Sequence, residues 1–324
     1  MAVFRSIEHS FRAATLAFIT LLGAESAEAQ CVPERESYFV MDARTGEVLL
    51  EKDAGIRVQP ASMAKLMTLL LAQEAIDKGL MSVDDRLVIA SNTSLRADME
   101  RLSGWRGSVR LGDAMKGAAI SSFNDLAATI AEYTAKAFKA GRTEIEFVTL
   151  MNRRAQELGM GDTQFYNASG LPRRLVRVQA GGSTTRDLAI LLKHISDHHP
   201  ALAELLGTGE AKVRGQSLKN TNTLLHNVSL AYQNIFGKTG YTCDAGYALT
   251  AHVQQGERRV IASYVGGKDA KEREKAFVAI LDQAFAVPIP KKPEGEARIH
   301  QADLREPEEI PCPTEAPDGL ECVR

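Results

Sequence analysis

The stretch VQPASMAKLMTLLLAQEAI, residues 58–76, predicts the central helix of the fold. From Met63 to Ile76 it contains good helix formers and neither Gly nor Pro. It is apolar on nearly every side, which is typical of a helix buried in the middle of a domain. Lys65 stands at the start of this helix, three residues after Ser62, and a charged side chain there needs a chemical reason.

The spacing of Ser62 and Lys65 gives that reason, because positions i and i+3 share a helix face. Burial disfavours the ammonium form, so we expect the pKa of Lys65 to fall. A neutral amine can take the hydroxyl proton of Ser62 and make this serine a nucleophile. The alternative is that Ser62 caps the helix and Lys65 reaches solvent. S-x-x-K alone does not separate the two, since about one match occurs by chance in such a chain.

Two further motifs favour the catalytic interpretation. The helical stretch AAISSFNDLAATIAE contains Ser-Phe-Asn at 122–124, and NIFGKTGYTCDAGYAL contains Lys-Thr-Gly at 238–240 on a predicted strand. S-x-x-K, S-x-N and K-T-G in this order are typical of β-lactamases and penicillin-binding proteins. The ordered triple is much more specific than any one of the motifs.

The likeness extends to longer stretches: NASGLP (167–172), STTRDLAILLKHI (183–195), LKNTNTLL (218–225), KTGYT and AGYAL. Over about residues 35–286 the chain resembles the low-molecular-mass penicillin-binding proteins, which are serine D-Ala-D-Ala carboxypeptidases of peptidase family S11. The sequence departs from the family at Phe123, where a small residue is usual, and at Lys268, where Arg is common.

The resemblance implies a role for each residue that carries chemistry. Ser62 would attack the carbonyl of the penultimate D-Ala of a peptidoglycan stem peptide and form an acyl-enzyme, with Lys65 as the base. Ser122 would pass a proton to the leaving amine, and Asn124 would hydrogen-bond Lys65 or the substrate amide. β-Lactam antibiotics would be covalent inhibitors, and no cofactor or metal is required.

The resemblance also implies how the terminal carboxylate is held. Lys238 would attract it, with the Thr239 hydroxyl as a second donor, and would further lower the pKa of Lys65. Lys268 follows a strand that by resemblance neighbours the Lys238 strand, so we expect it to contribute a weaker carboxylate contact than Arg would.

The resemblance further implies how the backbone of the substrate peptide is bound. Gly240 would let the substrate lie against the strand edge. The N–H groups of Ser62 and Tyr241 would form the oxyanion hole.

The order of the predicted elements indicates an α+β fold. Residues 37–53 form a predicted hairpin, residues 62–206 are mostly helical, strands return from about residue 234, and residues 271–286 form a closing helix. Strands at both ends would complete one antiparallel sheet, with the large helical region inserted between them. The expected helices of that region cover Asp125–Ala140, Ile145–Leu158 and Thr185–Ser196.

The ends of the chain predict export. Residues 1–29 carry two arginines, an apolar run too short to span a bilayer and a small-x-small cleavage site, which is typical of a signal peptide. An uncleaved membrane anchor is the alternative. Residues 30–286 are the predicted catalytic domain. Residues 287–324 hold seven of the 11 prolines and many glutamates, and they predict a disordered tail without an apolar anchoring face. We therefore expect a periplasmic protein with no stable membrane anchor.

Charge and cysteine content set further limits. The net charge of −2 gives no electrostatic reason to bind nucleic acid. The seven histidines form no HExxH motif, and His198 and His199, before a proline, indicate a helix end rather than a zinc hydrolase. Among the four cysteines, Cys312 and Cys322 are the expected pair, while Cys243 could line the cleft or pair with Cys31.

Two competing functions follow from the same motifs. A class A β-lactamase would carry a Glu in an E-x-x-L-N loop to activate the deacylating water, and the sequence has no such loop. A non-catalytic binding module would be expected to have a broken motif, whereas all three motifs are intact. Carboxypeptidase and endopeptidase action use the same chemistry, and the sequence leaves that choice open.

Overall fold

The computed structural model describes residues 35–89, 101–171, 182–227 and 229–288. The predicted signal peptide and nearly all of the predicted tail lie outside these ranges, as do three of the four cysteines. The compact unit that contains the described residues ends at Val287.

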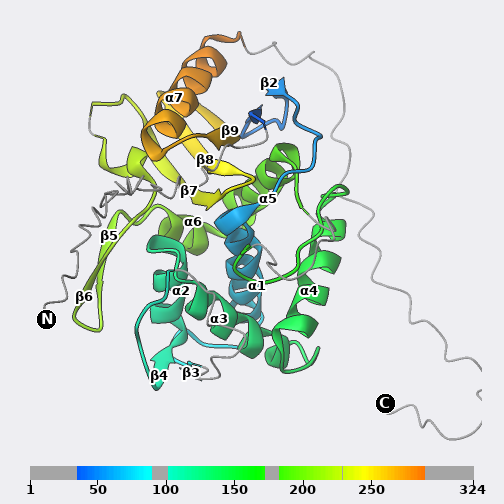
Figure 1. Ribbon diagram of the computed structural model, residues 1–324, viewed down its shortest axis with the longest axis vertical. Coiled ribbons are helices and arrows are strands. Elements are labelled where there is room, and N and C mark those ends of the chain that lie inside the picture. Colours follow the sequence, from blue (N-terminus) through cyan, green and yellow to red (C-terminus); the bar gives the residue numbers. More distant parts are fainter. Residues whose placement is uncertain (1–34, 90–100, 172–181, 228, 289–324) are drawn as a thin grey trace, which may run out of the picture. The chain divides into compact units, whose positions relative to one another are not determined.

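A five-stranded antiparallel sheet has the strand order β2-β1-β9-β8-β7 (Figure 1). Its first two strands form the predicted hairpin, and its last three follow the helical region. Because β1 pairs with β9, the sheet joins the two ends of the unit, and the predicted α+β arrangement is confirmed. The strands are β1 (Ser37–Asp42), β2 (Val48–Lys52), β7 (Gln233–Thr242), β8 (Gly246–Gln255) and β9 (Arg258–Gly267).

Helices cover both faces of this sheet. Side chains of a strand alternate between faces, and Val40 accordingly packs in one apolar cluster with Phe277 of α7 (Ala270–Ala286), while Phe39 packs in another. The Phe39 cluster includes residues of α5 (Thr185–His198), whose N-cap is Thr184. The sheet is therefore the middle layer, and Figure 1 shows α7 on one side of it and α5 with α1 on the other.

The inserted helical region contains the expected helices and some unexpected elements. Its helices are α1 (Lys65–Asp77), α2 (Leu111–Ile120), α3 (Asn124–Ala137), α4 (Glu144–Glu157), α5 and α6 (Pro200–Leu206). Two small hairpins, β3-β4 (Arg86–Val88, Ser108–Arg110) and β5-β6 (Glu210–Val213, Gln216–Lys219), were not predicted. Strands of three or four residues are too short to show a clear alternating pattern.

The central helix is buried along nearly its whole length, as predicted. It begins two residues later than expected, because a 3₁₀ helix, η1 (Ala61–Ala64), precedes α1. Ser62 therefore lies on the 3₁₀ turn, and Lys65 is the first residue of α1.

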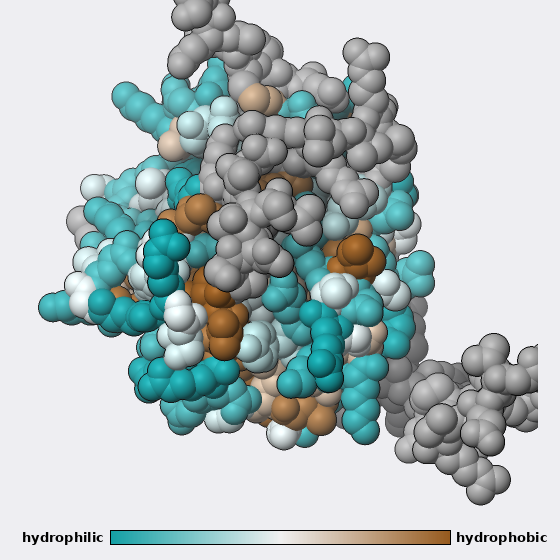
Figure 2. Space-filling view, turned by 60° about the horizontal axis from the view of Figure 1, so that its bottom comes forward, coloured by the Kyte–Doolittle hydropathy of each residue, from teal (hydrophilic) through white to brown (hydrophobic). Residues whose placement is uncertain are grey.

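Hydrophobic side chains of the described residues form small patches among hydrophilic ones on the face shown in Figure 2. The large apolar residues that are exposed come from many different elements: Val48, Leu80, Val83, Val88, Leu102, Ile145 and Tyr241. None of the helices in the described ranges has both the length and the apolar character to cross a bilayer.

Candidate active site

The Nζ atom of Lys65 is surrounded by three oxygen atoms. It lies 2.9 Å from Ser62 Oγ, 2.7 Å from Asn124 Oδ1 and 2.8 Å from the carbonyl oxygen of Ser169. The side chain has no exposed surface. The interpretation in which Ser62 caps the helix and Lys65 reaches solvent is therefore wrong: no side chain caps η1 or α1, and the lysine points inward.

The environment of Lys65 favours the neutral amine. Burial lowers its pKa well below the ordinary value, and the nearby charges of Lys238 and Arg101 lower it further. A neutral amine has two N–H donors and one lone pair. The oxygens of Asn124 and Ser169 can only accept, so they take both donors, and the lone pair faces Ser62 Oγ. The geometry therefore directs the Ser62 proton toward Lys65.

Ser122 lies in the short connection between α2 and α3, in a strained conformation. Its φ of 61° is in the left-handed region that non-glycine residues rarely adopt. Its hydroxyl is buried and has no hydrogen-bond partner among the described residues. Unpaired buried groups and strained backbone both occur preferentially at functional sites. Phe123, the residue that departs from the family pattern, packs edge-to-face against Trp105.

Ser169 was not predicted as a site residue, yet its carbonyl holds Lys65 in place. Asn167 Oδ1 accepts hydrogen bonds from the backbone N–H groups of Ser169 and Gly170, which fixes this turn. A side chain at Gly170 would collide with the carbonyl of Ala61, and its φ of 78° favours glycine. The signal in the sequence was the family-like stretch NASGLP, which indicated resemblance but not this contact.

The Lys-Thr-Gly motif lies on β7, the edge strand of the sheet. Lys238 is almost completely buried, and burial together with the charges of Arg101 and Arg273 lowers its pKa to about 7. A Cβ added to Gly240 would lie 2.9 Å from Ala61 Cβ and 3.3 Å from the backbone nitrogen of Ser62. Glycine at this position therefore lets the edge strand approach the turn that carries Ser62.

Two other predicted residues, Thr239 and Tyr241, lie on either side of Gly240 on β7. Tyr241 follows Gly240 on β7, is 46% exposed, and packs against Tyr247 with tilted rings whose centroids are 4.4 Å apart. The Thr239 hydroxyl lies 2.6 Å from that of Thr221, so one of the two donates a hydrogen bond to the other.

The predicted position of Lys268 needs a correction. Its strand, β9, does not neighbour the Lys238 strand, because β8 lies between β9 and β7. The Lys268 side chain is 75% exposed and pairs loosely with Glu272, at 3.9 Å. Resemblance in sequence could not give the strand order, which is set by pairing between distant segments.

Two arginines that were not predicted lie close enough to influence the site lysines. Arg273 is buried on α7, donates to Thr223 Oγ1 at 3.0 Å, and leaves its Nε unpaired among the described residues. Its charge lowers the pKa of Lys238. Arg101 is exposed, and its charge lowers the pKa of both Lys65 and Lys238. The charge repulsion between these groups indicates a site prepared for an anion.

Cys243 follows the Lys-Thr-Gly strand and is disulfide-bonded. Its partner lies outside the described residues, as does the predicted Cys312–Cys322 pair.

In this site a serine is hydrogen-bonded to a buried lysine, and both lie beside the edge strand that carries Lys-Thr-Gly. This arrangement is typical of the class formed by β-lactamases and penicillin-binding proteins. The chain belongs to the D-alanyl-D-alanine carboxypeptidase family, peptidase family S11, whose model matches residues 24–269.

Characterised relatives agree with this membership. The chain is 33% identical to the D-alanyl-D-alanine carboxypeptidase DacF of Bacillus subtilis, over 78% of this chain and 62% of the relative. It is 30% identical to DacC of Escherichia coli, over 81% of this chain and 63% of that protein. The chain thus spans about three fifths of the length of these relatives.

Solved structures show the same fold. Penicillin-binding protein D2 of Listeria monocytogenes in its ampicillin-bound form has a TM-score of 0.66 at 28% identity, covering 77% of this chain and 96% of that one. Penicillin-binding protein 6B of Escherichia coli has a TM-score of 0.66 at 29% identity, with 76% of each chain covered.

Proposed function

We propose that the protein is a serine D-Ala-D-Ala carboxypeptidase that removes the terminal D-alanine from peptidoglycan stem peptides and is acylated by penicillins. The observation that carries this proposal is the 2.9 Å contact between Lys65 Nζ and Ser62 Oγ in a buried, cation-rich site. Family membership and the ampicillin-bound relative support it.

Acylation starts when Lys65 Nζ takes the proton of the Ser62 hydroxyl. Ser62 Oγ then forms a bond to the carbonyl carbon of the penultimate D-Ala, and the oxyanion accepts from the N–H groups of Ser62 and Tyr241. The proton that Lys65 has accepted is relayed through the Ser122 hydroxyl to the leaving amine as the C–N bond breaks, which returns Lys65 to its neutral form. Asn124 keeps Lys65 oriented throughout. Water then hydrolyses the ester and restores Ser62.

The terminal carboxylate of the substrate binds near Lys238 and Thr239. A charged Lys238 supplies attraction. When Thr221 donates to Thr239, the Thr239 hydroxyl keeps its own proton and donates it to the carboxylate. Arg101 adds positive potential at the exposed side of the site. Gly240 leaves room for the peptide backbone at the free edge of β7.

Incubation with a pentapeptide ending in D-Ala-D-Ala tests this function. Release of one D-Ala per peptide is expected, and fluorescent penicillin should label the wild type but not Ser62→Ala. A folded Ser62→Ala protein that is labelled as strongly as the wild type would refute the assignment of the nucleophile.

The expectation that Lys268 binds the carboxylate has its own test, although β8 separates its neighbouring strand β9 from β7. If Lys268 contributes, Lys268→Ala has a reduced kcat/KM on the same peptide, and Lys268→Arg keeps or raises it, since a guanidinium binds a carboxylate with two hydrogen bonds. Arg273→Lys is the variant for comparison with Lys268→Ala, because it alters another cation near the site while keeping the positive charge at the buried position 273. An unchanged kcat/KM in Lys268→Ala would remove Lys268 from the binding site.

Endopeptidase action on cross-linked peptides is a second candidate. The chain is 32% identical to a D-alanyl-D-alanine endopeptidase of Pseudomonas aeruginosa, over 66% of this chain and 65% of that protein. Incubation with purified cross-linked muropeptide dimers and with monomeric pentapeptides, at equal concentrations, distinguishes the two reactions by their kcat/KM ratio.

Slow deacylation separates a penicillin target from a β-lactamase, and we expect the penicilloyl-enzyme to persist because no E-x-x-L-N loop supplies a general base.

We also propose that the protein is exported and acts in the periplasm. The apolar run followed by a cleavage site in residues 1–29 supports this. Recovery of the mature chain in the membrane or cytoplasmic fraction of cells would contradict it.

A further inference from the structure

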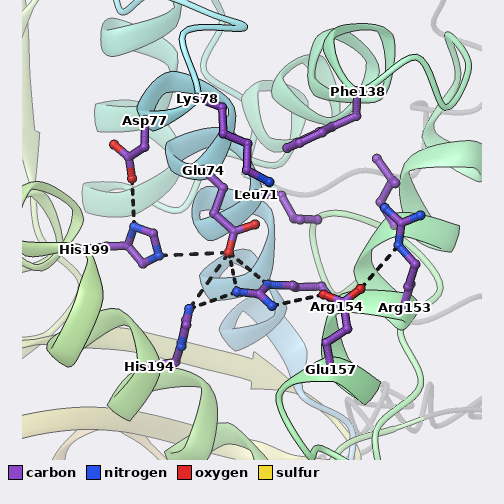
Figure 3. A pocket seen from close by; sticks show the side chains of 11 residues that line it. Leu71, Glu74, Asp77, Lys78, Phe138, Arg153, Arg154, Glu157, His194 and His199 are labelled. Carbon is purple, nitrogen blue, oxygen red and sulfur yellow. Dashed lines mark hydrogen bonds and ion pairs between the residues drawn. The ribbon is translucent and has the colours of Figure 1, made fainter. Parts of the chain in front are cut away.

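A second cluster of ionisable side chains lies at the opposite end of α1 from the catalytic serine. Glu74, His194 and His199 each offer one ligand atom, and these atoms all lie within 4.8 Å of one another. Glu74 follows Lys65 by nine residues, which is about 14 Å along the helix axis. The cluster adjoins a pocket of about 430 Å³ (Figure 3).

The lone pair of His194 points toward the centre of this cluster. Its Nε2 lies 3.2 Å from Nη2 of Arg154. A guanidinium can only donate, so Nε2 must be the unprotonated acceptor nitrogen.

The second imidazole is oriented by a carboxylate. His199 Nδ1 lies 3.0 Å from Asp77 Oδ2. A carboxylate can only accept, so Nδ1 carries a proton, and in the tautomer that this contact selects the lone pair is on Nε2. That Nε2 faces Glu74 Oε1 at 4.0 Å (Figure 3). A carboxylate that fixes the tautomer of a ligating histidine is a recurring feature of metal sites.

A cation already lies at the point where these acceptors converge. Arg154 of α4 donates from Nη2 to Glu74 Oε1 at 2.8 Å and from Nε to the same oxygen at 2.9 Å. Nη2 therefore contacts both Glu74 and His194, as a metal ion would. Arg154 also has an alternative partner on its own helix, Glu157, 3.0 Å from Nη1. The guanidinium can thus leave the cluster without losing every ion pair.

We propose that Glu74, His194 and His199 bind a divalent transition metal of the Zn²⁺ type when the Arg154 guanidinium swings away toward Glu157. Two imidazoles and one carboxylate are a recurrent zinc ligand set that leaves the fourth position for water. Glu74, His194 and His199 all line the adjoining pocket, which is where water would reach the ion. Mg²⁺ and Ca²⁺ prefer oxygen ligands and are disfavoured.

The metal would join three helices that the chain brings together from distant positions. Glu74 lies on α1, His194 on α5, and His199 caps α6. Such a bond would hold the C-terminal half of the helix whose first residue is Lys65. The binding energy would therefore add to the free energy of unfolding of the native state.

The test uses the full chain, freed of metal with a chelator and titrated with Zn²⁺ against a competing fluorescent chelator. One Zn²⁺ per chain and a raised Tm are expected, with no Tm change in the same concentration of Mg²⁺. Arg154→Gln should bind Zn²⁺ at least about tenfold more tightly, because the competing cation is gone. An unchanged circular dichroism spectrum of Arg154→Gln shows that the gain does not come from an unfolded chain whose histidines bind the metal.

Loss-of-affinity variants locate the ion. Glu74→Gln and His194→Asn should each weaken Zn²⁺ binding by at least about tenfold, and Asp77→Ala by about 10- to 100-fold through the orientation of His199. His226→Gln, which alters an imidazole outside the cluster, is the matched control and should bind as the wild type does. An unchanged Kd in Arg154→Gln, or wild-type affinity in both Glu74→Gln and His194→Asn, would overturn the proposal.

Discussion

Lys65 is unusual among buried lysines because all three of its hydrogen-bond partners are neutral oxygens. A lysine that hydrogen-bonds a carboxylate keeps its proton, whereas here Ser62, Asn124 and the Ser169 carbonyl provide no compensating charge. Asp125 is the one nearby acid that favours the charged form, and its two oxygens are bonded to Ser103. The surroundings of Lys65 therefore favour the neutral amine, which can act as a base.

The pH dependence of acylation should follow the two site lysines. Only neutral Lys65 is a base, so kcat/KM should rise with pH as Lys65 loses its proton. The charge of Lys238 contributes to carboxylate binding and is lost above about 7, so kcat/KM should then fall. Acylation by a penicillin measured from about pH 5 to 10 checks this. A rate that keeps rising through the whole range would exclude a carboxylate-binding role for charged Lys238.

Lys65→Arg is the matching variant. A guanidinium does not deprotonate, so acylation should slow by about 10²-fold or more while the protein stays folded. Penicillin labelling at near wild-type rate, with an unchanged circular dichroism spectrum, would show that Lys65 is not the base.

Ser122 should show a conflict between stability and activity. Its left-handed backbone suits glycine, so Ser122→Gly should be more stable than Ser122→Ala by about 1 kcal/mol. Both variants lack the hydroxyl and should be acylated about 10²-fold more slowly than the wild type. Urea unfolding and penicillin labelling measure the two effects. Equal stability of the two variants would mean that the conformation is not strained.

The active site depends on how closely two elements approach. The edge strand β7 passes the 3₁₀ helix η1 with only the hydrogen atom of Gly240 between them. The nucleophile turn and the Lys-Thr-Gly strand are thereby held at a fixed separation, in which the substrate carbonyl has to fit.

Gly240→Ala should disturb this separation. The added methyl lies closer to Ala61 than packing allows, so β7 or η1 must shift. A displacement of about 1 Å reduces catalysis by about 10²-fold, and we expect that loss in the acylation rate. Gly161→Ala, where an added Cβ meets nothing within 4 Å, is the control and should keep full activity. Full activity in Gly240→Ala would refute the argument.

At the scale of the whole molecule, function opposes stability. The site lies between the helical region and the sheet, and two lysines are buried there although neither forms an ion pair among the described contacts. The unfolded chain binds their protons more readily than the native state does, so the free energy of unfolding should rise with pH above about 7. Below that pH the destabilisation is at its greatest.

Lys238→Met should therefore stabilise the protein. The buried charge is removed, and Tm should rise by a few degrees at pH 6, with the difference from the wild type shrinking as pH approaches about 10, where the unfolded lysine also loses its proton. Lys268→Met, at an exposed position, is the control and should leave Tm unchanged. A lower Tm in Lys238→Met at pH 6 would contradict this account of the site.

Much of the fold could be predicted from the sequence, because local patterns of apolar and polar residues indicate helices and strands. The apolar run after Ser62 predicted the central helix, and strands at the two ends predicted a shared sheet. The start of α1 and the two small hairpins were missed, since a 3₁₀ turn and three-residue strands leave no periodic signal.

The sequence by itself determined the chemistry of the site. Ser62 and Lys65 one turn apart, followed in order by Ser-Phe-Asn and Lys-Thr-Gly, predicted a nucleophile and its base without knowledge of how the chain packs.

Only the tertiary structure decided the surroundings of that pair. The Ser169 carbonyl is 104 residues from Lys65, and Arg273 acts on Lys238 from the last helix. The convergence of Glu74 with His194 and His199 likewise joins three helices. No local pattern encodes such contacts, because they arise from the packing of segments that are distant in the chain. The burial that lowers the pKa of both lysines has the same origin.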